Sequence, residues 1–220
     1  MKTNYQLELD NLIEKIKDLP EKPTLLLHAC CAPCSSYCLE YLINYFRITI
    51  FYYNPNIYPQ SEYERRLEEL ITFLPKIPEY KDAVTLIKTT YNQNDYFEAI
   101  NVKEEAEMAK EPEKGERCRR CYEFRMKKAY EYALEHDFEY FCTTLSISPF
   151  KDSVKINVIG KELENTEKPK WLTSDFKKHS GFLRSLELSK EYGLYRQQYC
   201  GCIYSYNSYK EREAENATFD

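Results

Sequence analysis

The sequence predicts an α/β protein with a mostly parallel sheet and helices on both faces of that sheet. Short segments rich in β-branched and aromatic residues alternate along the chain with longer segments whose apolar residues recur at helical spacing. Parallel neighbours need right-handed crossovers, so the turns that follow the strands gather at one edge of the sheet. Three groups of cysteines lie at expected turns, and we expect them to meet at this carboxyl edge.

The expected elements alternate through the whole chain. Pro20 and Pro23 end an amphipathic first helix. Ser61 and Glu64 have the spacing of a capping box, which predicts that a helix starts there. We expect strands over residues 24–28, 47–53, 83–89, 138–143 and 170–173, and helices over residues 4–19, 35–45, 61–74, 94–110 (in one or two pieces), 122–136, 153–163, 180–192 and after Cys202.

The composition limits the possible function classes. Of the 220 residues, 31 are Lys or Arg and 36 are Asp or Glu, so the protein has no overall basic field. It has five glycines, with neither a G-x-G-x-x-G motif nor a P-loop. The N-terminal residues lack the apolar core of a signal peptide, and no apolar run approaches membrane length. We therefore expect a cytoplasmic protein with no membrane partner, in a single domain composed of an N-terminal helical arm (1–23), a catalytic core (24–204) and a C-terminal helix or tail (205–220).

Nine cysteines need an explanation in a reducing compartment, where structural disulfides are rare. Cys38 lies on the apolar face of an expected helix, where we expect a small buried hydrophobe. Seven of the other cysteines form three groups whose spacing is typical of metal binding or redox chemistry. These groups are Cys30, Cys31 and Cys34; Cys118 and Cys121; and Cys200 and Cys202.

The number and spacing of the thiols favour an iron–sulfur cluster over zinc. A structural zinc site takes four ligands, usually from two motifs close in sequence, whereas these groups are spread through the chain. A [4Fe-4S] cluster takes four thiolates, and adjacent cysteines can bind two different irons of it. The expected cluster ligands are Cys30, Cys31, Cys118 and Cys121. Cys34, Cys200 and Cys202 remain for a second metal or a redox pair, and the place of Cys34 at a helix N-terminus predicts a lowered pKa.

Basic residues flank two of the cysteine groups. Residues 117–128 contain six Lys or Arg against one Glu, and residues 168–198 contain seven against three acidic residues. We expect a basic rim that receives a polyanion, with a solvated helix face as the alternative. His28 precedes the first cysteine group, and we expect a hydrogen-bonded histidine at a strand end rather than a ligand. The residues expected in the basic rim include Arg117, Arg119, Arg120, Lys151 and Arg196.

Several of these motifs occur together, in the same order, in one protein family. The chain resembles the QueH-type epoxyqueuosine reductases from about residue 25 to residue 204. The stretches that carry the resemblance are residues 28–34, 51–57, 61–66, 117–121, 143–149 and 195–202.

The resemblance implies a HUP-like, Rossmann-like fold and an enzyme that reduces epoxyqueuosine to queuosine at the wobble base of tRNAs with GUN anticodons. It also implies a [4Fe-4S] cluster, a second mononuclear iron and no cobalamin. Electrons would come from an external donor of the ferredoxin or flavodoxin type, and tRNA would contact the basic rim. Some members have Asp where this chain has Cys34, so this position resembles a metal ligand. Others have a redox-active Cys-x-Cys. The role of Cys200 and Cys202 therefore stays open between metal ligands and a redox-active pair.

The reaction agrees with the residue types. Converting an epoxide to an alkene removes the oxygen as water and needs two electrons and two protons, and an incompletely ligated iron is a suitable Lewis acid. The modified base must leave the anticodon loop and enter a pocket. Asp152 and His28 are candidate proton sources. The expected catalytic residues are Cys34, Cys200, Cys202 and Asp152, and the candidate stacking residues are Tyr52, Tyr53, Tyr58, Phe150 and Tyr199.

Two other function classes compete with this interpretation. Cluster-dependent sulfonucleotide reductases and tRNA-thiolating enzymes need a glycine- and serine-rich pyrophosphate loop after the first strand. This chain has Cys-Cys-Ala-Pro-Cys there, which argues against them. The alternative of another class is a non-catalytic zinc protein that binds RNA, and metal analysis would distinguish it from an iron–sulfur enzyme.

Overall fold

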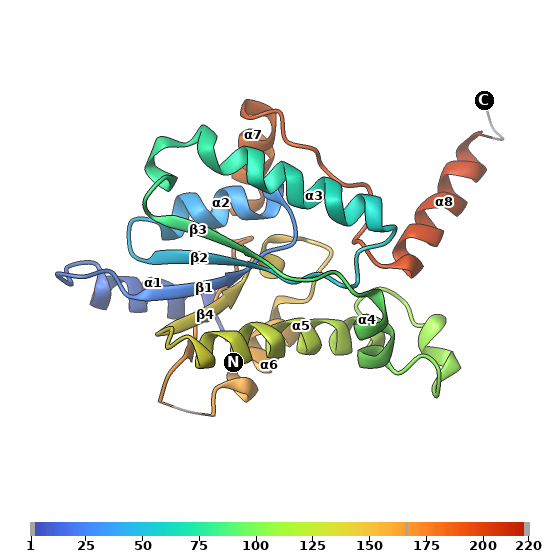
Figure 1. Ribbon diagram of the computed structural model, residues 1–220, viewed down its shortest axis with the longest axis horizontal. Helices are drawn as coiled ribbons and strands as arrows, with labels where there is room; N and C mark the ends of the chain where they lie inside the picture. The colour runs from blue at the N-terminus through green and yellow to red at the C-terminus, as the bar shows by residue number, and fades with distance from the viewer. Residues whose placement is uncertain (1–2, 166, 218–220) are drawn as a thin grey trace.

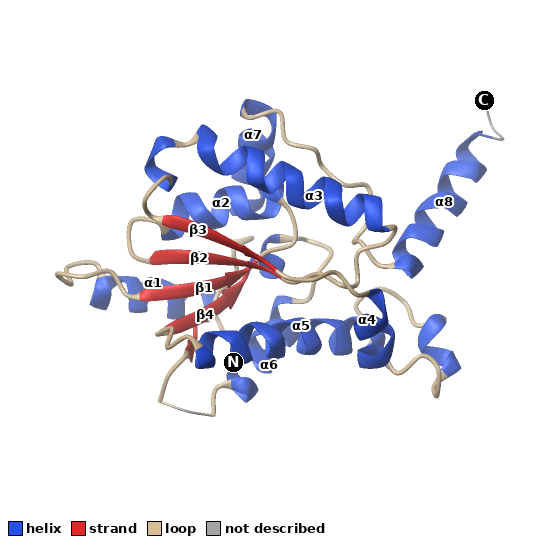
Figure 2. Cartoon of the chain, in the orientation of Figure 1, coloured by secondary structure: helices blue, strands red, loops and turns tan. Residues whose placement is uncertain are grey.

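The computed structural model, which describes residues 3–165 and 167–217, contains a five-stranded parallel sheet (Figure 2). The strand order is β3-β2-β1-β4-β5, so β1 is central and the α/β prediction is confirmed. The strands are β1 (Thr24–His28), β2 (Arg47–Tyr52), β3 (Val84–Lys88), β4 (Tyr140–Thr143) and β5 (Lys170–Trp171).

Helices cover both faces of the sheet. In Figure 1, α2 (Ala32–Leu42), α3 (Gln60–Phe73) and α7 (Gly181–Glu191) lie on one side, and α5 (Glu116–Glu135) and α6 (Ser153–Leu163) lie on the other. The C-terminal helix α8 extends away from the sheet. The remaining helices are α1 (Tyr5–Ile16), α4 (Gln93–Ile100) and α8 (Ile203–Ala217), with short 3₁₀ turns at Leu74–Lys76, Pro78–Tyr80, Ala106–Ala109 and Thr144–Ile147.

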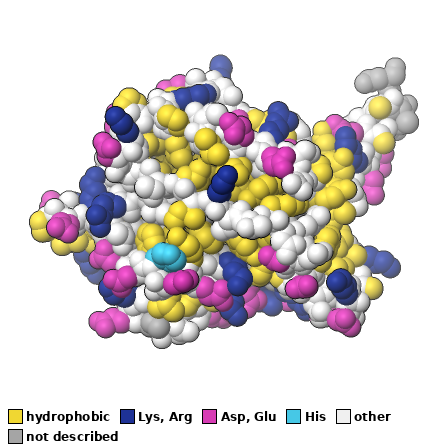
Figure 3. All heavy atoms as spheres, in the orientation of Figure 1, with side chains coloured by type: hydrophobic (Ala, Val, Ile, Leu, Met, Phe, Trp, Pro, Cys, Tyr) yellow, Lys and Arg dark blue, Asp and Glu magenta, His cyan; other side chains and the backbone are white. Residues whose placement is uncertain are grey.

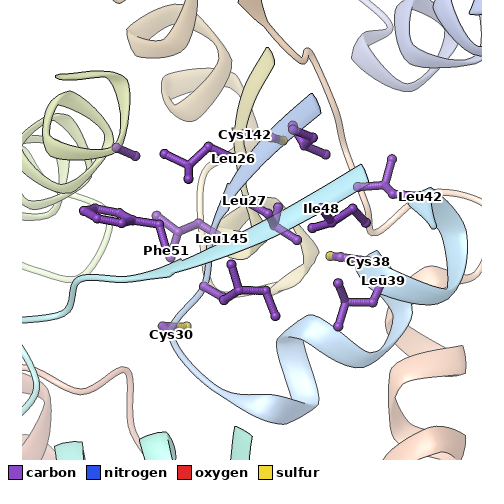
Figure 4. Packing of buried hydrophobic residues seen from close by; sticks show 14 of the residues in the cluster. Leu26, Leu27, Cys30, Cys38, Leu39, Leu42, Ile48, Phe51, Cys142 and Leu145 are labelled. Carbon is purple, nitrogen blue, oxygen red and sulfur yellow. The ribbon is translucent and has the colours of Figure 1, made fainter. Parts of the chain in front are cut away.

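The central strand is apolar because both of its faces are covered. Leu25, Leu26 and Leu27 are fully buried, as expected for the middle of a parallel sheet. Figure 4 shows Leu27 beside Ile48 of β2 and near the α2 face that carries Cys38. Cys38 is fully buried, which confirms its expected role as a small hydrophobe.

The edge strand β3 is less well covered. Its residues Leu86 and Ile87 are only half-buried. In Figure 3, hydrophobic side chains form a band between the helices above and below the sheet on this side of the molecule.

The arm formed by α1 is attached to the core by apolar packing and by one polar cluster. Leu9, Ile13 and Ile16 are buried. Asp10 accepts a hydrogen bond of 2.8 Å from the Tyr41 hydroxyl and pairs with the His179 imidazole at 3.0 Å. Among residues 3–165 and 167–217, no helix combines the length and apolarity that a membrane span requires.

Several helix boundaries differ from the sequence-based expectation. Helix α2 begins at Ala32 rather than at residue 35, because Pro33 fits the first turn, where its fixed φ and missing N–H cost nothing. The capping-box prediction is wrong: α3 begins at Gln60 after Pro59, and Ser61 lies inside the helix without capping it. The region 94–110 divides into α4 and a 3₁₀ turn.

The boundary of α5 matters most for function. This helix begins at Glu116, so Cys118 and Cys121 lie in its first two turns instead of in a preceding turn. Residues three apart on a helix share a face. The two thiols are therefore held on one rigid surface.

The strand order creates a switch point beside β1. Strand β1 is followed along the chain by β2 on one side, and the chain returns to β4 on the other side. In such sheets, ligands bind outside the carboxyl ends of two neighbouring strands whose following connections run in opposite directions. The segment after β1 begins the first cysteine group, and the segment after β4 forms the 3₁₀ turn Thr144–Ile147.

Candidate metal centre

The first thiol group is formed locally by Cys30, Cys31 and Cys34. Their sulfur atoms all lie within 4.8 Å of one another, and this group could hold a metal ion. Cys30 comes two residues after β1 ends, Cys31 precedes α2 in an extended conformation, and Cys34 lies in the first turn of α2. The start of α2 thus brings the three thiol side chains together.

The second thiol group, formed by Cys118, Cys121, Cys200 and Cys202, is assembled by long-range contacts. Cys121 on α5 and Cys202 before α8 are buried in the same apolar cluster as Tyr96 and Ile100 of α4. Burial first, and then the nearby thiols of Cys200 and Cys202, raise the pKa of Cys121 to about 12. Burial and then Cys200 also raise the pKa of Cys118.

Two cations lie close to both thiol groups, the buried Arg125 and the half-buried Lys151. The Lys151 ammonium donates a hydrogen bond of 3.2 Å to Cys200 Sγ. Burial acts to lower the pKa of Lys151, but the nearby thiols of Cys200 and Cys30 raise it overall. Arg125 Nε donates to the Cys121 carbonyl at 3.2 Å, and the thiols of Cys121 and Cys30 lie close enough to raise the pKa of this residue. The two thiol groups therefore share the same positive charges.

The three thiols of the first group do not ionise alike. Contacts with Cys31 and then Cys34 lower the pKa of Cys30, and Lys151 and Arg125 lower it further. The contact with Cys30 raises the pKa of Cys31 to about 12, and contacts with Cys30 and Cys31 raise that of Cys34. The expectation of a lowered pKa for Cys34 is wrong, because its place in the helix turn brings it against two other thiols, and both raise its pKa. Of the three thiols, Cys30 is the one whose pKa is lowered.

The Cys-x-Cys segment is held by a buried ion pair on α3. The Arg66 side chain is completely buried and pairs with Glu62 at 2.7 Å. Its terminal nitrogens donate to the carbonyls of Cys200 at 3.2 Å and Tyr199 at 3.3 Å. Gly201, with φ of +135°, takes a conformation open to glycine, and its carbonyl accepts from the amide of Tyr58 at 2.7 Å.

The strand-end histidine has a structural role, as expected. His28 is fully buried between the Thr143 hydroxyl at 2.8 Å from Nδ1 and the Tyr53 carbonyl at 3.1 Å from Nε2. Because a carbonyl only accepts hydrogen bonds, Nε2 carries the proton and Nδ1 accepts from Thr143. Burial, and then the charge of Arg125, lower the pKa of His28 to about 4. The imidazole is therefore neutral, and its two hydrogen bonds join the ends of β1, β2 and β4.

A cavity of about 320 Å³ opens beside the first thiol group. Cys30, Cys34 and Cys200 lie in its wall, and Phe150, which is 69% exposed, stands at the same cavity. Of the candidate stacking residues, Phe150 and Tyr199 line the cavity, whereas Tyr52 and Tyr53 are buried in the core. The other lining residues are Pro33, Glu113, Ile147, Ser148, Pro149, Lys151, Phe182, Ser185, Arg196, Gln197, Gln198 and Arg212.

Comparison with known proteins agrees with this geometry. The sequence model of the family described as Epoxyqueuosine reductase QueH matches residues 25–208. A QueH of Streptococcus pyogenes is 39% identical and covers 93% of this chain and 80% of its own length. A QueH of Staphylococcus epidermidis is 38% identical over 93% of this chain and 85% of its own length. A QueH of Thermotoga maritima is 33% identical over 87% of this chain and 95% of its own length.

The chain belongs to the epoxyqueuosine reductase QueH family. The resemblance found in its motifs is confirmed, and the chain is an enzyme of the oxidoreductase class. The matched residues 25–208 include both thiol groups and every residue of the cavity wall except Arg212.

The five basic residues expected in the rim lie in different environments. Arg117 is buried and donates to the carbonyls of Met108 and Ala109. Arg119 pairs with Glu116 and Glu123, and Arg120 with Glu105 and Glu116. Lys151 and Arg196 line the cavity. The RNA contacts of all five basic residues stay predictions.

The carboxylate of Asp152 caps α6. It accepts from the backbone amides of Val154 at 3.0 Å and Lys155 at 3.1 Å. Asp152 is not among the residues of the cavity wall. Its catalytic role stays a prediction.

Sequence reasoning missed three residues of the site. Arg66 follows Glu62 by four positions on an expected helix, which is the spacing of a helical ion pair and a usable signal. Arg125 follows Cys121 by four positions, but it is one of six basic residues in the run 117–128, and nothing in the sequence distinguishes it from the exposed ones. Gln197, whose amide nitrogen lies 3.1 Å from Cys31 Sγ, has no local signal, because 166 positions separate the two residues.

We expect Arg66→Met to destabilise the protein by about 3–5 kcal/mol, because it leaves the buried Glu62 carboxylate without its cation. The exposed neighbour Arg65, whose guanidinium lies over the Tyr195 ring, provides the control, and Arg65→Met should cost less than about 1 kcal/mol. Urea unfolding followed by circular dichroism measures both. Equal losses in the two variants would mean that the buried pair does not hold the Cys-x-Cys segment.

Proposed function

We propose that this QueH family member reduces epoxyqueuosine to queuosine at the wobble position of tRNAs with GUN anticodons. The observation that carries the proposal is a family match over residues 25–208 together with two thiol groups that lie near the same two cations beside an open cavity. We place the reaction in the cytoplasm, with electrons from an external donor of the ferredoxin or flavodoxin type.

The donor set fits an iron–sulfur centre. Seven thiols exceed what one zinc needs, and they are buried or half-buried, which shields a cluster from water. The Arg125 and Lys151 cations supply positive charge where bound thiolates would be negative. When bound, the metals would supply single electrons and Lewis acidity. Cys30, Cys31, Cys118 and Cys121 would hold a [4Fe-4S] cluster. Cys34, Cys200 and Cys202 would hold a second iron. In the alternative, Cys200 and Cys202 would form a redox-active pair.

The residues of the cavity would receive the modified base. Phe150 offers an exposed ring on which a nucleobase can stack, and stacking tolerates any base. Arg196 lies at the same cavity and can contact a phosphate of the anticodon loop. Lys151 keeps its charge at the cavity wall beside Cys200, where it favours the negative charge that develops as a carbon–oxygen bond breaks.

We expect anaerobically prepared protein to contain iron and labile sulfide and to convert epoxyqueuosine-containing tRNA when a low-potential reductant is added. Cys121→Ser should lose both the cluster and the activity, because one anchoring thiolate is gone. Cys38→Ala, a change at a buried cysteine outside both groups, should keep both. Iron and sulfide analysis together with nucleoside analysis of the tRNA measure this, and a folded, reconstituted parent protein without iron would refute the cluster.

Arg196→Gln should weaken tRNA binding and reduce its salt dependence. Loss of one phosphate contact lowers the slope of log K against log salt by ~0.7 for a single-stranded target. Lys15→Gln removes the same charge from an exposed site on α1, outside both basic runs, and should change neither quantity. Binding titrations at several salt concentrations test this, and identical slopes for the parent and Arg196→Gln would exclude the contact.

Cys34→Asp should keep both cluster and activity, because a carboxylate is also an iron ligand. Cys34→Ala should keep the cluster but lose most of the activity, since the second iron loses a ligand. Iron counted per protein and the tRNA assay, run on both variants, separate the possible roles. Full activity in Cys34→Ala would refute a ligand role, and cluster loss in that variant would place Cys34 among the cluster anchors.

A further inference from the structure

Arg125 is a buried cation without a carboxylate partner. Its side chain is among the largest that are fully buried, and the whole residue is 2% exposed. Among residues 3–165 and 167–217, no ion pair joins it to an acidic side chain, and one of its terminal nitrogens has no hydrogen-bond partner. A guanidinium always carries its charge, so this charge must be balanced by something else.

The two bonds that Arg125 makes connect the two cysteine motifs expected to hold the cluster. Its Nε donates to the Cys121 carbonyl at 3.2 Å. Another nitrogen lies 3.5 Å from Asn54 Oδ1, and the Asn54 amide donates to the Ala29 carbonyl at 2.8 Å, one residue before Cys30. Arg125 therefore stands between Cys121 and the turn that carries Cys30.

The other buried arginines show what Arg125 lacks. Arg66 is equally buried but has the Glu62 carboxylate at 2.7 Å. Arg117 donates to two carbonyls at 2.9 Å and stacks over the Tyr204 ring, with its centre 4.3 Å away. A buried charge without a counter-charge is strongly unfavourable.

Thiols are the groups around Arg125 that can supply the missing negative charge. Burial acts to lower the pKa of Arg125, but the nearby thiols of Cys121, Cys30 and Cys200 raise it overall. Thiolates that bind a metal stay deprotonated and carry the negative charge of the centre. The position of Arg125 thus matches a bound anionic centre better than it matches free thiols.

We propose that Arg125 is the built-in counter-charge of the metal–thiolate centre and raises its reduction potential, an inference that rests on the iron–sulfur centre of the proposed function. Reduction adds one electron, taken from the external donor, and neither makes nor breaks a bond. A fixed positive charge nearby stabilises the more negative, reduced form over the oxidised form, and burial strengthens the effect. Arg125 is a positioning residue, because it acts on the reaction through the centre.

The test is a redox titration of anaerobically loaded protein, with the reduced fraction followed by electron paramagnetic resonance. In Arg125→Gln, the ratio of reduced to oxidised centre at a fixed solution potential should fall about tenfold, which corresponds to a shift of ~59 mV to more negative potential for one electron. Lys127→Gln removes the same charge from an exposed position on the same helix and should leave the potential unchanged. Arg125→Lys, which keeps the charge, should restore most of the parent potential.

The remaining outcomes also decide the question. Loss of the centre from Arg125→Gln together with its retention in Arg125→Lys would support the proposal, because Lys keeps the positive charge that Gln lacks. A parent-like potential in Arg125→Gln, or loss of the centre from both variants, would overturn it and leave Arg125 with a packing role. A parent protein that takes up no iron would instead refute the iron–sulfur centre itself, and a loaded parent that does not convert tRNA would refute only the substrate.

Discussion

The burial of positive charge beside thiols is the constraint on which the rest of the site depends. Arg125 is buried and Lys151 half-buried; burial acts to lower the pKa of each, and nearby thiols raise it. Contacts with Cys31 and Cys34, and then these two cations, lower the pKa of Cys30. The buried cation therefore depends on the thiols around it, because no carboxylate of the described residues pairs with it.

The fold meets this constraint with two rigid helix starts. Helix α2 begins within the first thiol group, and α5 carries Cys118 and Cys121 on one face. The third motif lies directly before α8, and the Arg66–Glu62 pair also holds its backbone. Catalytic precision at a metal requires such fixed donors, because ligand positions must be held within fractions of an ångström.

The cavity opens beside the thiols of Cys30, Cys34 and Cys200. Cys30 and Cys34 form part of one wall, and Phe150 remains largely exposed at the same cavity. An exposed aromatic ring at a cavity offers a surface on which a nucleobase can stack. The arginines of the α5 run contribute less to this side, because Glu105, Glu116 and Glu123 neutralise Arg119 and Arg120.

The strands, the parallel α/β class and the cysteine motifs could be read from the sequence, because these depend on local periodicity and on residue types. Strand β1 and helix α6 have the predicted bounds, since proline, turn residues and a capping Asp152 mark their ends. Which charges are buried became visible in the folded structure alone. Arg119 and Arg125 belong to one basic run, yet one meets carboxylates at the surface and the other meets thiols in the core. The sequence predicts that the cysteine groups meet, but it does not show that Cys202 packs with Cys121 in an apolar cluster, because contacts between residues 81 positions apart depend on how helices pack.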